Sequence, residues 1–367
     1  MRFVCERNIL LKEISIAQEI IASKNVISIL SNIYLEAEND SLTIKATDLK
    51  VNFETKVPVT VLEPGPATVF GDKFLGILGS VPEGEMEFEY NDNKVKIKTS
   101  VKKANFQLKS MASDKFPEFP VSDTPYFDIP IKEFKEMVGQ TAFAVSDDET
   151  RFFMNGVFLE NVEGKLAMVA TDGRRLAYIS KDSGGVADFA GIIVPPKILN
   201  IITKRSGDEG LVSISVTAKT IFIRFGTYSL SSVLIEGNFP NYRKVIPEEQ
   251  TSSFSINRKE MLDALKRVSL LVEQKSHRVY FSLKPGVMEV SSEEGEIGDA
   301  KEEIPCQYDG EEISLALNYR YIEEPFKAIA SDDVCVRFTN PSKAITITPL
   351  TDPEADFFHI VMPMQSS

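Results

Sequence analysis

An internal repeat of about 124 residues constrains the fold of this 367-residue chain more than any other feature. Three segments open alike, each with a short apolar run followed by an amphipathic helical pattern, and they begin at Phe3, Phe127 and Phe254. The intervals are 127 − 3 = 124 and 254 − 127 = 127 residues, which is the length of a domain and not of a solenoid repeat. The sequence therefore predicts three domains on one plan, covering residues 1–124, 125–250 and 251–367.

Later elements recur in the same order within each copy. A second helical pattern begins near Lys73, Lys197 and Asn318, and a hairpin of alternating or apolar strands follows each one. Two helices and several antiparallel strands per copy define an α+β fold in which the helices cover one face of sheet. Chance similarity between strand–helix segments is the alternative, and it does not explain why so many elements share one offset.

A tight turn in the second copy has a counterpart in the first. Ala170-Thr171-Asp172-Gly173 is followed by two arginines, and Ala46-Thr47-Asp48 precedes a basic residue 172 − 48 = 124 positions earlier. Asp-Gly favours a turn because glycine adopts positive φ at no steric cost. Since Asp48 repeats Asp172, we expect Asp172 to cap the turn. The alternative is an enzyme of unknown chemistry with Asp172 and Arg175 in its site.

The usual motifs of catalytic and metal sites are missing from the sequence. The two histidines have no metal-ligand neighbour at helical spacing, and no phosphate loop, dinucleotide fingerprint or nucleophile elbow occurs. The acidic run from Asp147 to Glu149 is more typical of a solvated loop than of a magnesium site, which recruits acids from several elements. We predict no catalytic residue, no metal and no cofactor.

Composition places the chain among globular proteins, with 43% hydrophobic and 26% charged residues. No run of eighteen apolar residues and no signal-peptide pattern occurs, so we expect neither a membrane span nor export. Three widely spaced cysteines fit buried thiols in a reducing cytoplasm.

Charge argues against tight nucleic-acid binding by the chain as a whole, because the formal net charge is −13. The expected helices nevertheless carry Lys and Arg, whereas the hairpins and linkers hold most acidic clusters. Basic helices on one side would reconcile the net charge with a phosphate-facing surface. Ordinary helix solvation is the alternative, since Glu133, Glu136 and Glu260 lie on the same helices.

Several motifs together resemble one family. These are the three α+β repeats, the Met1-Arg2-Phe3 opening, the Thr-Asp-Gly-x-Arg-Leu run, the segment from Asn238 to Pro247, and the ending Val361-Met362-Pro363-Met364. In this combination the whole chain resembles the bacterial DNA polymerase III β subunits, the replicative sliding clamps. The resemblance implies the DNA clamp fold, closed as a head-to-tail homodimer into a ring of six domains around duplex DNA. It implies no catalytic activity.

The resemblance also implies a pocket for partner peptides between the second and third domains. Met and Leu walls adapt to different apolar anchors, and two or three anchors at about 1.5–3 kcal/mol each give roughly micromolar affinity after association costs. Carried onto this chain, the pocket comprises Met154, Thr171, Gly173, Arg174, Arg175, Leu176, Pro240, Val245, Asn318, Tyr321, Ala344, Ile360, Val361, Met362, Pro363 and Met364.

Some positions depart from the family pattern. Arg174 stands where many members have His, and Met154 replaces a more usual Leu. The chain ends in Gln365-Ser366-Ser367 where Arg-Leu is common.

DNA-facing and dimer-contact residues follow from the same resemblance. The DNA-facing candidates are Lys24, Lys73, Arg151, Lys197 and Arg205. For the dimer seam, Phe106 and Leu108 would meet Leu270 and Leu271 of the other subunit, with packing inside one domain as the alternative.

The implied partners are duplex DNA bound without sequence preference, a second copy of the chain, and proteins that dock through short apolar motifs. The docking proteins are the replicative polymerase, the clamp loader, repair and translesion polymerases, mismatch-repair proteins and ligase. The implied location is the cytoplasm, in association with the nucleoid, without membrane contact. The main alternative is a monomeric adaptor that binds apolar peptides and never encircles DNA.

Overall fold

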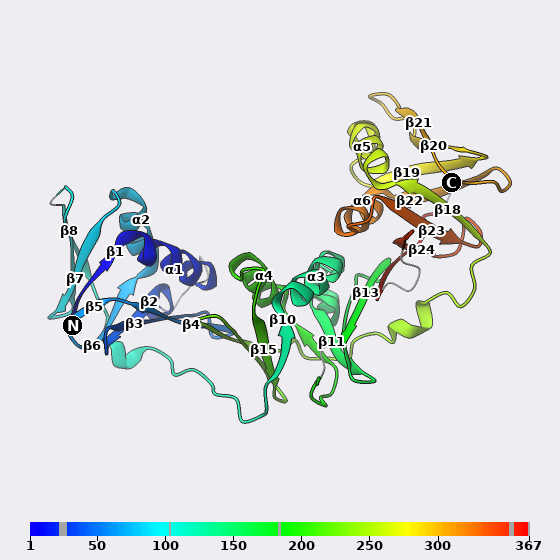
Figure 1. The fold of residues 1–367 in the computed structure, drawn as a ribbon. Helices are drawn as coiled ribbons and strands as arrows, with labels where there is room; N and C mark the ends of the chain where they lie inside the picture. Colours follow the sequence, from blue (N-terminus) through cyan, green and yellow to red (C-terminus); the bar gives the residue numbers. More distant parts are fainter. Residues whose placement is uncertain (22–27, 103, 183–184, 352–355, 366–367) are drawn as a thin grey trace. The chain divides into compact units, whose positions relative to one another are not determined.

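The computed structural model describes residues 1–21, 28–102, 104–182, 185–351 and 356–365 (Figure 1). The chain divides into two compact units. The first contains residues 1–132 and 197–234, and the second contains residues 133–196 and 235–367. The first copy of the repeat lies within the first unit and the third copy within the second, whereas the elements of the second copy are divided between them.

The first unit holds an eight-stranded sheet in the order β10-β15-β16-β17-β4-β3-β2-β6 and a five-stranded sheet in the order β5-β1-β7-β8-β9, with antiparallel pairing throughout. Its strands are β1 (Arg2–Glu6), β2 (Asn32–Glu38), β3 (Ser41–Thr47), β4 (Val51–Pro58), β5 (Thr60–Glu63), β6 (Gly65–Phe70), β7 (Glu85–Asn91), β8 (Lys94–Thr99), β9 (Asn105–Lys109), β10 (Phe127–Pro130), β15 (Leu211–Val216), β16 (Thr220–Phe225) and β17 (Tyr228–Val233).

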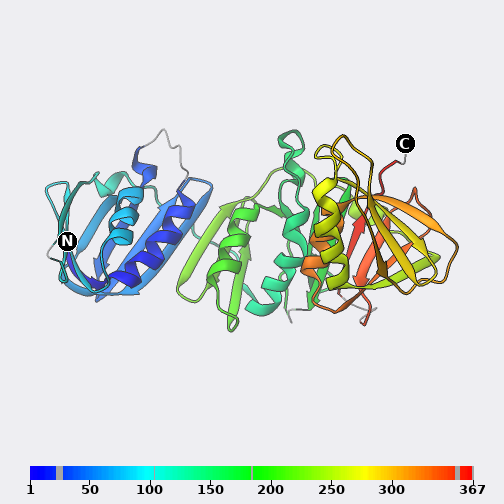
Figure 2. The ribbon, with the colours of Figure 1, turned by 90° about the horizontal axis from the view of Figure 1, so that it is seen from above.

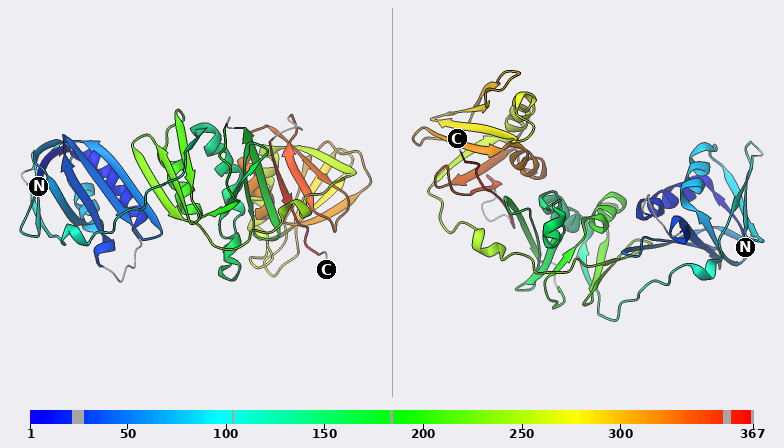
Figure 3. Two further views of the ribbon diagram at one scale, coloured as in Figure 1. Left: turned by 90° about the horizontal axis from the view of Figure 1, so that it is seen from below. Right: turned by 180° about the vertical axis from the view of Figure 1, so that it is seen from behind.

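Helices cover one face of these sheets. Helix α1 (Arg7–Ile20) contacts α2 (Gly71–Ser80) and the strands β3 and β4. Figure 2 shows α1 and α2 side by side, and from the opposite side the strands lie in front of the helices (Figure 3). Phe3, Phe74 and Phe88 fill the interior, with ring centroids 4.9 Å apart for Phe3 and Phe88 and 5.8 Å apart for Phe74 and Phe88. Helix α4 spans Pro196–Arg205.

The second unit repeats this plan with an eight-stranded sheet in the order β14-β11-β12-β13-β25-β24-β23-β18 and a four-stranded sheet in the order β21-β20-β19-β22. Its strands are β11 (Val157–Val162), β12 (Lys165–Thr171), β13 (Arg175–Asp182), β14 (Ile192–Val194), β18 (Ser252–Asn257), β19 (Arg278–Lys284), β20 (Val287–Ser292), β21 (Lys301–Pro305), β22 (Ile313–Asn318), β23 (Asp333–Phe338), β24 (Ile345–Pro349) and β25 (Phe357–Val361).

Three helices belong to the second unit: α3 (Ile131–Thr141), α5 (Arg258–Val268) and α6 (Tyr319–Ala328). Helix α5 begins at Arg258 because Asn257 caps it, its side-chain oxygen accepting from the amides of Lys259 and Glu260. Helices α5 and α6 contact each other over a core that contains Phe281, Phe326 and Phe338. No helix within the described ranges is long and apolar enough to cross a membrane.

Each unit contains a joint at which strands of successive copies pair. In the first unit β4 pairs with β17, and Phe53 lies opposite Leu230. In the second unit β13 pairs with β25, and Leu176 lies opposite Ile360. The strands β4 and β13 are equivalent, since Arg175 follows Val51 by 175 − 51 = 124 positions. The repeat pattern predicted the helices and hairpins but did not predict these joining strands.

Candidate functional site

The Thr-Asp-Gly turn leads into the joint of the second unit. Asp172 Oδ1 accepts from the amides of Arg174 at 2.8 Å and Arg175 at 3.1 Å, and Gly173 has φ +88°. The equivalent turn of the first unit has the same bonds, from Lys50 (3.0 Å) and Val51 (2.7 Å) to Asp48 Oδ1. The predicted capping role of Asp172 is therefore confirmed.

An apolar pocket of about 230 Å³ lies beside this turn. Its floor is formed by Leu176 and Ile360, which are opposite each other on β13 and β25 and almost fully buried. Two exposed side chains, Val245 (52% exposed) and Met362 (44% exposed), form part of the wall. The complete lining is Met154, Thr171, Gly173, Arg174, Arg175, Leu176, Pro240, Asn241, Tyr242, Val245, Ile360 and Met362.

Two of these lining residues, Asn241 and Tyr242, were absent from the predicted set. Tyr242 is buried in the cluster with Val169, Leu176 and Ile360. Its hydroxyl donates to Glu160 Oε1 at 2.5 Å, and burial together with this carboxylate raises the pKa of Tyr242. The only sequence signal for Tyr242 as a pocket residue was its aromatic ring within the Asn238–Pro247 run. Its role could not be inferred because Glu160 lies 82 positions away.

The other predicted pocket residues lie outside this lining. Asn318 caps α6 by accepting from the amide of Arg320, and Val361 is buried within β25. Ala344 lines a neighbouring cavity that shares Val245 and Met362 with the pocket. Met364 donates its backbone N–H to the carbonyl of Ala316 at 2.8 Å. The remaining members of the predicted set outside the lining are Tyr321 and Pro363.

Arg175 connects several elements around the pocket. Its Nε donates to Asp172 Oδ2 at 3.1 Å, Nη2 donates to the carbonyl of Phe143 at 2.7 Å, and Nη1 donates to Glu324 on α6. The guanidinium also lies 4.5 Å from the ring centroid of Tyr321. Because its donors are used in this way, Arg175 holds β13 and α6 together rather than presenting a free charge.

Most of the predicted DNA-facing cations are held in ion pairs. Lys73 lies 3.2 Å from Asp72, and Lys197 Nζ lies 2.7 Å from Asp48 Oδ2. Arg205 pairs with Glu19. The corresponding prediction for Lys24 falls outside the described residues.

Arg151, the fifth predicted DNA-facing residue, lies beside the pocket. It belongs to the 3-10 segment η4 (Glu149–Met154), and its Nε donates to Asp148 Oδ2 at 2.9 Å. A Cβ on Gly173 would lie 3.0 Å from Arg151 Nη1, which places this guanidinium against the turn. Asp148 also caps η4, so Asp147 and Asp148 lie in a loop as predicted, whereas Glu149 begins the 3-10 segment. No group of three or more acidic, His or Cys side chains within the described ranges is placed to bind a metal.

The four predicted seam residues differ in exposure. Leu270 is 80% exposed in η6 (Ser269–Leu271), and Leu271 is half-buried beside it. Phe106 and Leu108 are half-buried on β9, opposite Ile97 and Val95. Packing within the five-stranded sheet therefore covers part of both β9 side chains.

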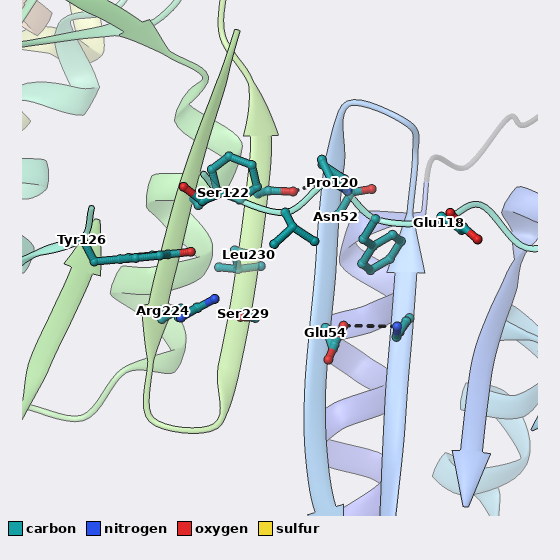
Figure 4. Close-up of a pocket in the computed structure, with 14 residues that line it drawn as sticks. Asn52, Glu54, Glu118, Pro120, Ser122, Tyr126, Arg224, Ser229 and Leu230 are labelled. Atoms are coloured by element: carbon teal, nitrogen blue, oxygen red, sulfur yellow. Dashed lines mark hydrogen bonds and ion pairs between the residues drawn. The ribbon is translucent and has the colours of Figure 1, made fainter. Parts of the chain in front are cut away.

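A second cavity, of about 430 Å³, lies over the joint of the first unit (Figure 4). Its charges balance, because Lys45 lies 3.3 Å from Glu54, and Arg224 and Glu118 also line it. Asn52 donates to Ser231 at 2.9 Å where the second joint has Leu176 and Ile360. The apolar floor is thus absent at the first joint.

Comparison with known proteins identifies the family. Three models for the DNA polymerase III beta subunit match the chain: the N-terminal domain at residues 1–120, the central domain at 128–241 and the C-terminal domain at 243–365. The beta sliding clamp of Treponema pallidum is 46% identical over 372 residues, and that of Caulobacter vibrioides is 28% identical over 373 residues. Both alignments cover all of both chains.

Solved structures agree over the full length. A sliding clamp from Pseudomonas aeruginosa bound to griselimycin superposes with a TM-score of 0.94 at 25% identity, and the Bacillus subtilis clamp with 0.93 at 26%. Each comparison covers 100% of both chains. The α+β plan with antiparallel sheets predicted from the repeat is the architecture observed here. The chain therefore belongs to the family of DNA polymerase III beta subunits, the beta sliding clamps, which are processivity factors without catalytic activity.

Proposed function

We propose that two copies of this chain close head to tail into a ring around duplex DNA and tether the replicative polymerase to its template. In this proposal the pocket floored by Leu176 and Ile360 binds the apolar peptide motifs of polymerases, clamp loader and repair proteins. The observation that carries the docking role is the apolar pocket with its exposed Val245 and Met362 walls. The repeat supports domain boundaries near residues 124 and 250.

The pairing of strands at the two joints supports a head-to-tail dimer. At each joint the fourth strand of one copy (β4 or β13) pairs with the last strand of the next copy (β17 or β25). The corresponding strands left over are β21 of the third copy and β9 of the first, and each ends its sheet. An open strand edge is a template for pairing with another chain. A third joint between β21 of one chain and β9 of another would use both edges.

Charge and exposed apolar surface favour the same seam. Near β21, a cavity of about 660 Å³ is lined by exposed Leu270 and Ile297 and by the carboxylates of Glu273, Glu294 and Glu296. Near β9, Lys94, Lys102 and Lys109 are exposed. Opposite charges on two surfaces steer their association and suppress other pairings.

Replacing Leu270 with aspartate is expected to raise the dimer dissociation constant at least tenfold. The change places a further carboxylate beside Glu273 and removes an apolar contact at both seams of the ring. Sedimentation velocity across a dilution series measures the constant. The matched control is Val121→Asp, since Val121 is 82% exposed on a linker segment outside the seam. Equal dissociation constants for the two variants would contradict the seam.

Truncating two pocket walls is expected to weaken peptide binding roughly tenfold to thirtyfold. Met362→Ala with Val245→Ala removes apolar contacts worth about 1.4–2 kcal/mol, and both side chains are exposed, so folding stability changes little. Calorimetric titration with a Gln-Leu-x-Leu-Phe peptide gives the affinity. Val233→Ala, at a 45% exposed apolar position in the first unit, serves as the control. Unchanged peptide affinity in the double variant excludes this pocket as the docking site.

The DNA-facing surface is proposed to use weak and mobile contacts. A closed ring retains DNA by topology, so a few cations per helix suffice, and stronger phosphate binding would add friction. Lys204 and Lys266 are exposed on α4 and α5 and supplement the five predicted cations. The proposed location is the cytoplasm, at the nucleoid.

Linearising a loaded circular template separates a ring from the alternative, a monomeric adaptor that binds apolar peptides only. If the protein forms a ring, it should slide off the ends of the cut DNA and remain on the uncut circle. Equal retention on both templates would exclude a sliding ring.

A further inference from the structure

A row of polar side chains crosses the joint of the first unit. Arg224 on β16 lies opposite Ser229 on β17. On the other side of Ser229 the row continues with Glu54 on β4 and Lys45 on β3. All four side chains line the cavity of about 430 Å³ in Figure 4. Because neighbouring strands lie about 4.8 Å apart, the row gives the cavity a polar floor roughly 14 Å long.

The linker between the first and second copies forms a second wall of this cavity. It is attached at two points, because the ring centroid of Phe119 lies 5.5 Å from Lys45 Nζ and Ser122 Oγ lies 2.6 Å from Ser215 Oγ. Between these attachments Val121 is 82% exposed. The linker is therefore fixed on both sides of the space that it borders.

One end of the cavity carries hydrogen-bond donors that the protein does not use. Arg224 is exposed, and its guanidinium forms no salt bridge or hydrogen bond with any residue that the structure describes. Its guanidinium carbon lies 4.3 Å from the centroid of the Tyr126 ring, which orients the guanidinium plane. The hydroxyls of Tyr126 and Ser229 also have no hydrogen-bond partner among these residues. Figure 4 shows Tyr126, Arg224 and Ser229 together at this end.

The remaining charges of the cavity do not compensate Arg224. Lys45 Nζ lies 3.3 Å from Glu54 Oε2, so these two side chains form a pair of their own. Glu118 is exposed and lies at the far end of the cavity from Arg224 (Figure 4). The formal charges of the lining sum to zero, but the end that contains Arg224 presents one positive charge.

We propose that this end of the cavity binds the carboxylate of a small organic acid, whose apolar body packs against Phe222 and Val121. The edge of a guanidinium offers two N–H groups in the geometry of a carboxylate, and the two hydroxyls beside it can donate to the same oxygens. A single positive charge matches a monoanion. A phosphate ester carries about two negative charges, and the second would lie near Glu54, two strands from Arg224. The site is separate from the apolar pocket and does not depend on ring closure.

A water-filled cavity with a solvated arginine is the competing interpretation, since many exposed ion pairs contribute almost nothing. Two features favour a ligand. The Tyr126 ring already orients the guanidinium, so binding costs less side-chain entropy, and no protein carboxylate has to leave Arg224 first. A bound acid would contact strands of the second copy and the linker from the first, so its binding would stabilise this joint.

Three probes that share one phenyl group test this inference. Saturation-transfer difference NMR of the full chain measures the binding of 3-phenylpropanoate, 3-phenylpropanamide and 2-phenylethyl phosphate. The wild-type chain is expected to bind the carboxylate with a dissociation constant of roughly 1 mM. The uncharged amide should bind about fivefold more weakly than the carboxylate, and the phosphate ester about threefold more weakly.

Substitutions assign the carboxylate to Arg224. In Arg224→Gln the affinity for 3-phenylpropanoate should fall about fivefold, whereas the affinity for the amide should stay within about twofold of wild type. Ser229→Leu, which fills the floor beside Arg224, should weaken the carboxylate and the amide alike. Arg320→Gln is the matched control, because Arg320 is also exposed, lies 6.0 Å from the ring centroid of Tyr319 and forms no salt bridge within the described part of the chain. It should leave all three affinities unchanged, and far-ultraviolet circular dichroism checks that each variant is folded.

Several outcomes would overturn the proposal. No saturable binding of 3-phenylpropanoate up to about 20 mM would show that the cavity holds water only. Equal affinities for the carboxylate and the amide would remove the role of the charge, and tighter binding of the phosphate ester would contradict the monoanion. Binding that Arg224→Gln leaves unchanged would place the acid at another site. Ring closure and peptide docking are measured separately, so they stand or fall independently of these results.

Discussion

Replacing Arg175 with alanine is expected to lower the free energy of unfolding by about 3 kcal/mol, because removing one partner of a buried charge network leaves the others uncompensated. The Arg175 side chain is 11% exposed and bonds to Asp172, Phe143 and Glu324, so its loss strands two carboxylates and a carbonyl. Glu324 is 35% exposed and can recover some hydration, so the expected loss of unfolding free energy is no larger than this.

Urea unfolding followed by far-ultraviolet circular dichroism measures this change, at one protein concentration for all variants because association shifts apparent stability. The adjacent Arg174→Ala is the matched control. Arg174 is exposed and forms no salt bridge with a described residue, so its truncation should stay within about 0.5 kcal/mol of wild type. Equal effects of the two substitutions would contradict the role of Arg175 as the tie between β13 and α6.

Acidification from pH 7 to pH 4 is expected to cost the fold about 3 kcal/mol through His359 alone. This side chain is fully buried, and burial lowers its pKa from 6.5 to about 3. Its Nε2 donates to Gln140 Oε1 at 2.9 Å, and Nδ1 has no hydrogen-bond partner among the described residues. A proton on Nδ1 would therefore be a buried charge beside the rings of Phe143 and Phe357.

The direction follows from the two protonation states. Above pH 6.5 the imidazole is neutral in both the folded and the unfolded chain, so its full contribution is present. Between pH 6.5 and about 3 the unfolded chain binds a proton that the folded chain does not, and stability falls by about 1.36 kcal/mol per pH unit.

The difference between wild type and His359→Gln isolates this term from the titration of carboxylates. Unfolding free energies at pH 7, 5 and 4 should fall less steeply in His359→Gln than in the wild-type chain. The other histidine of the sequence, His277, is half-buried at φ +52°, and His277→Asn provides the control. Parallel pH curves for wild type and His359→Gln would contradict the buried neutral imidazole.

Local signals in the sequence were sufficient for the helices and the turns. The helical pattern that follows the apolar run at Phe254 corresponds to α5, and Asp172 caps its turn in the way that Asp48 does. These features depend on residues within four positions of one another. The strands β4 and β13 were not predicted, because their partners β17 and β25 lie far along the chain and pairing is decided by contacts that no local window contains.

The same separation explains the differences at the site. Lys197 and Arg205 were assigned to the DNA-facing surface from the family resemblance, but their acidic partners Asp48 and Glu19 lie 149 and 186 positions away. Tyr242 was missing from the predicted pocket for a similar reason, because Glu160, which accepts the hydrogen bond of its hydroxyl, lies 82 positions away. The family resemblance named most of the residues that line the pocket. The ion-pair partners of individual charged residues could be identified only from the fold.

The pair Asn52 and Ser231 has a consequence for how many proteins one ring could serve at a time. Because these two polar side chains bond to each other where Leu176 and Ile360 form a floor, the proposed docking of apolar motifs would be confined to one of the two joints of each chain. The proposed two-chain ring would then have a valence of two. A polymerase and one further enzyme could be bound to the ring at the same time, and a third protein could bind only after one of them dissociates. The number of proteins docked on one ring would thus be limited by a single hydrogen-bonded pair in each subunit.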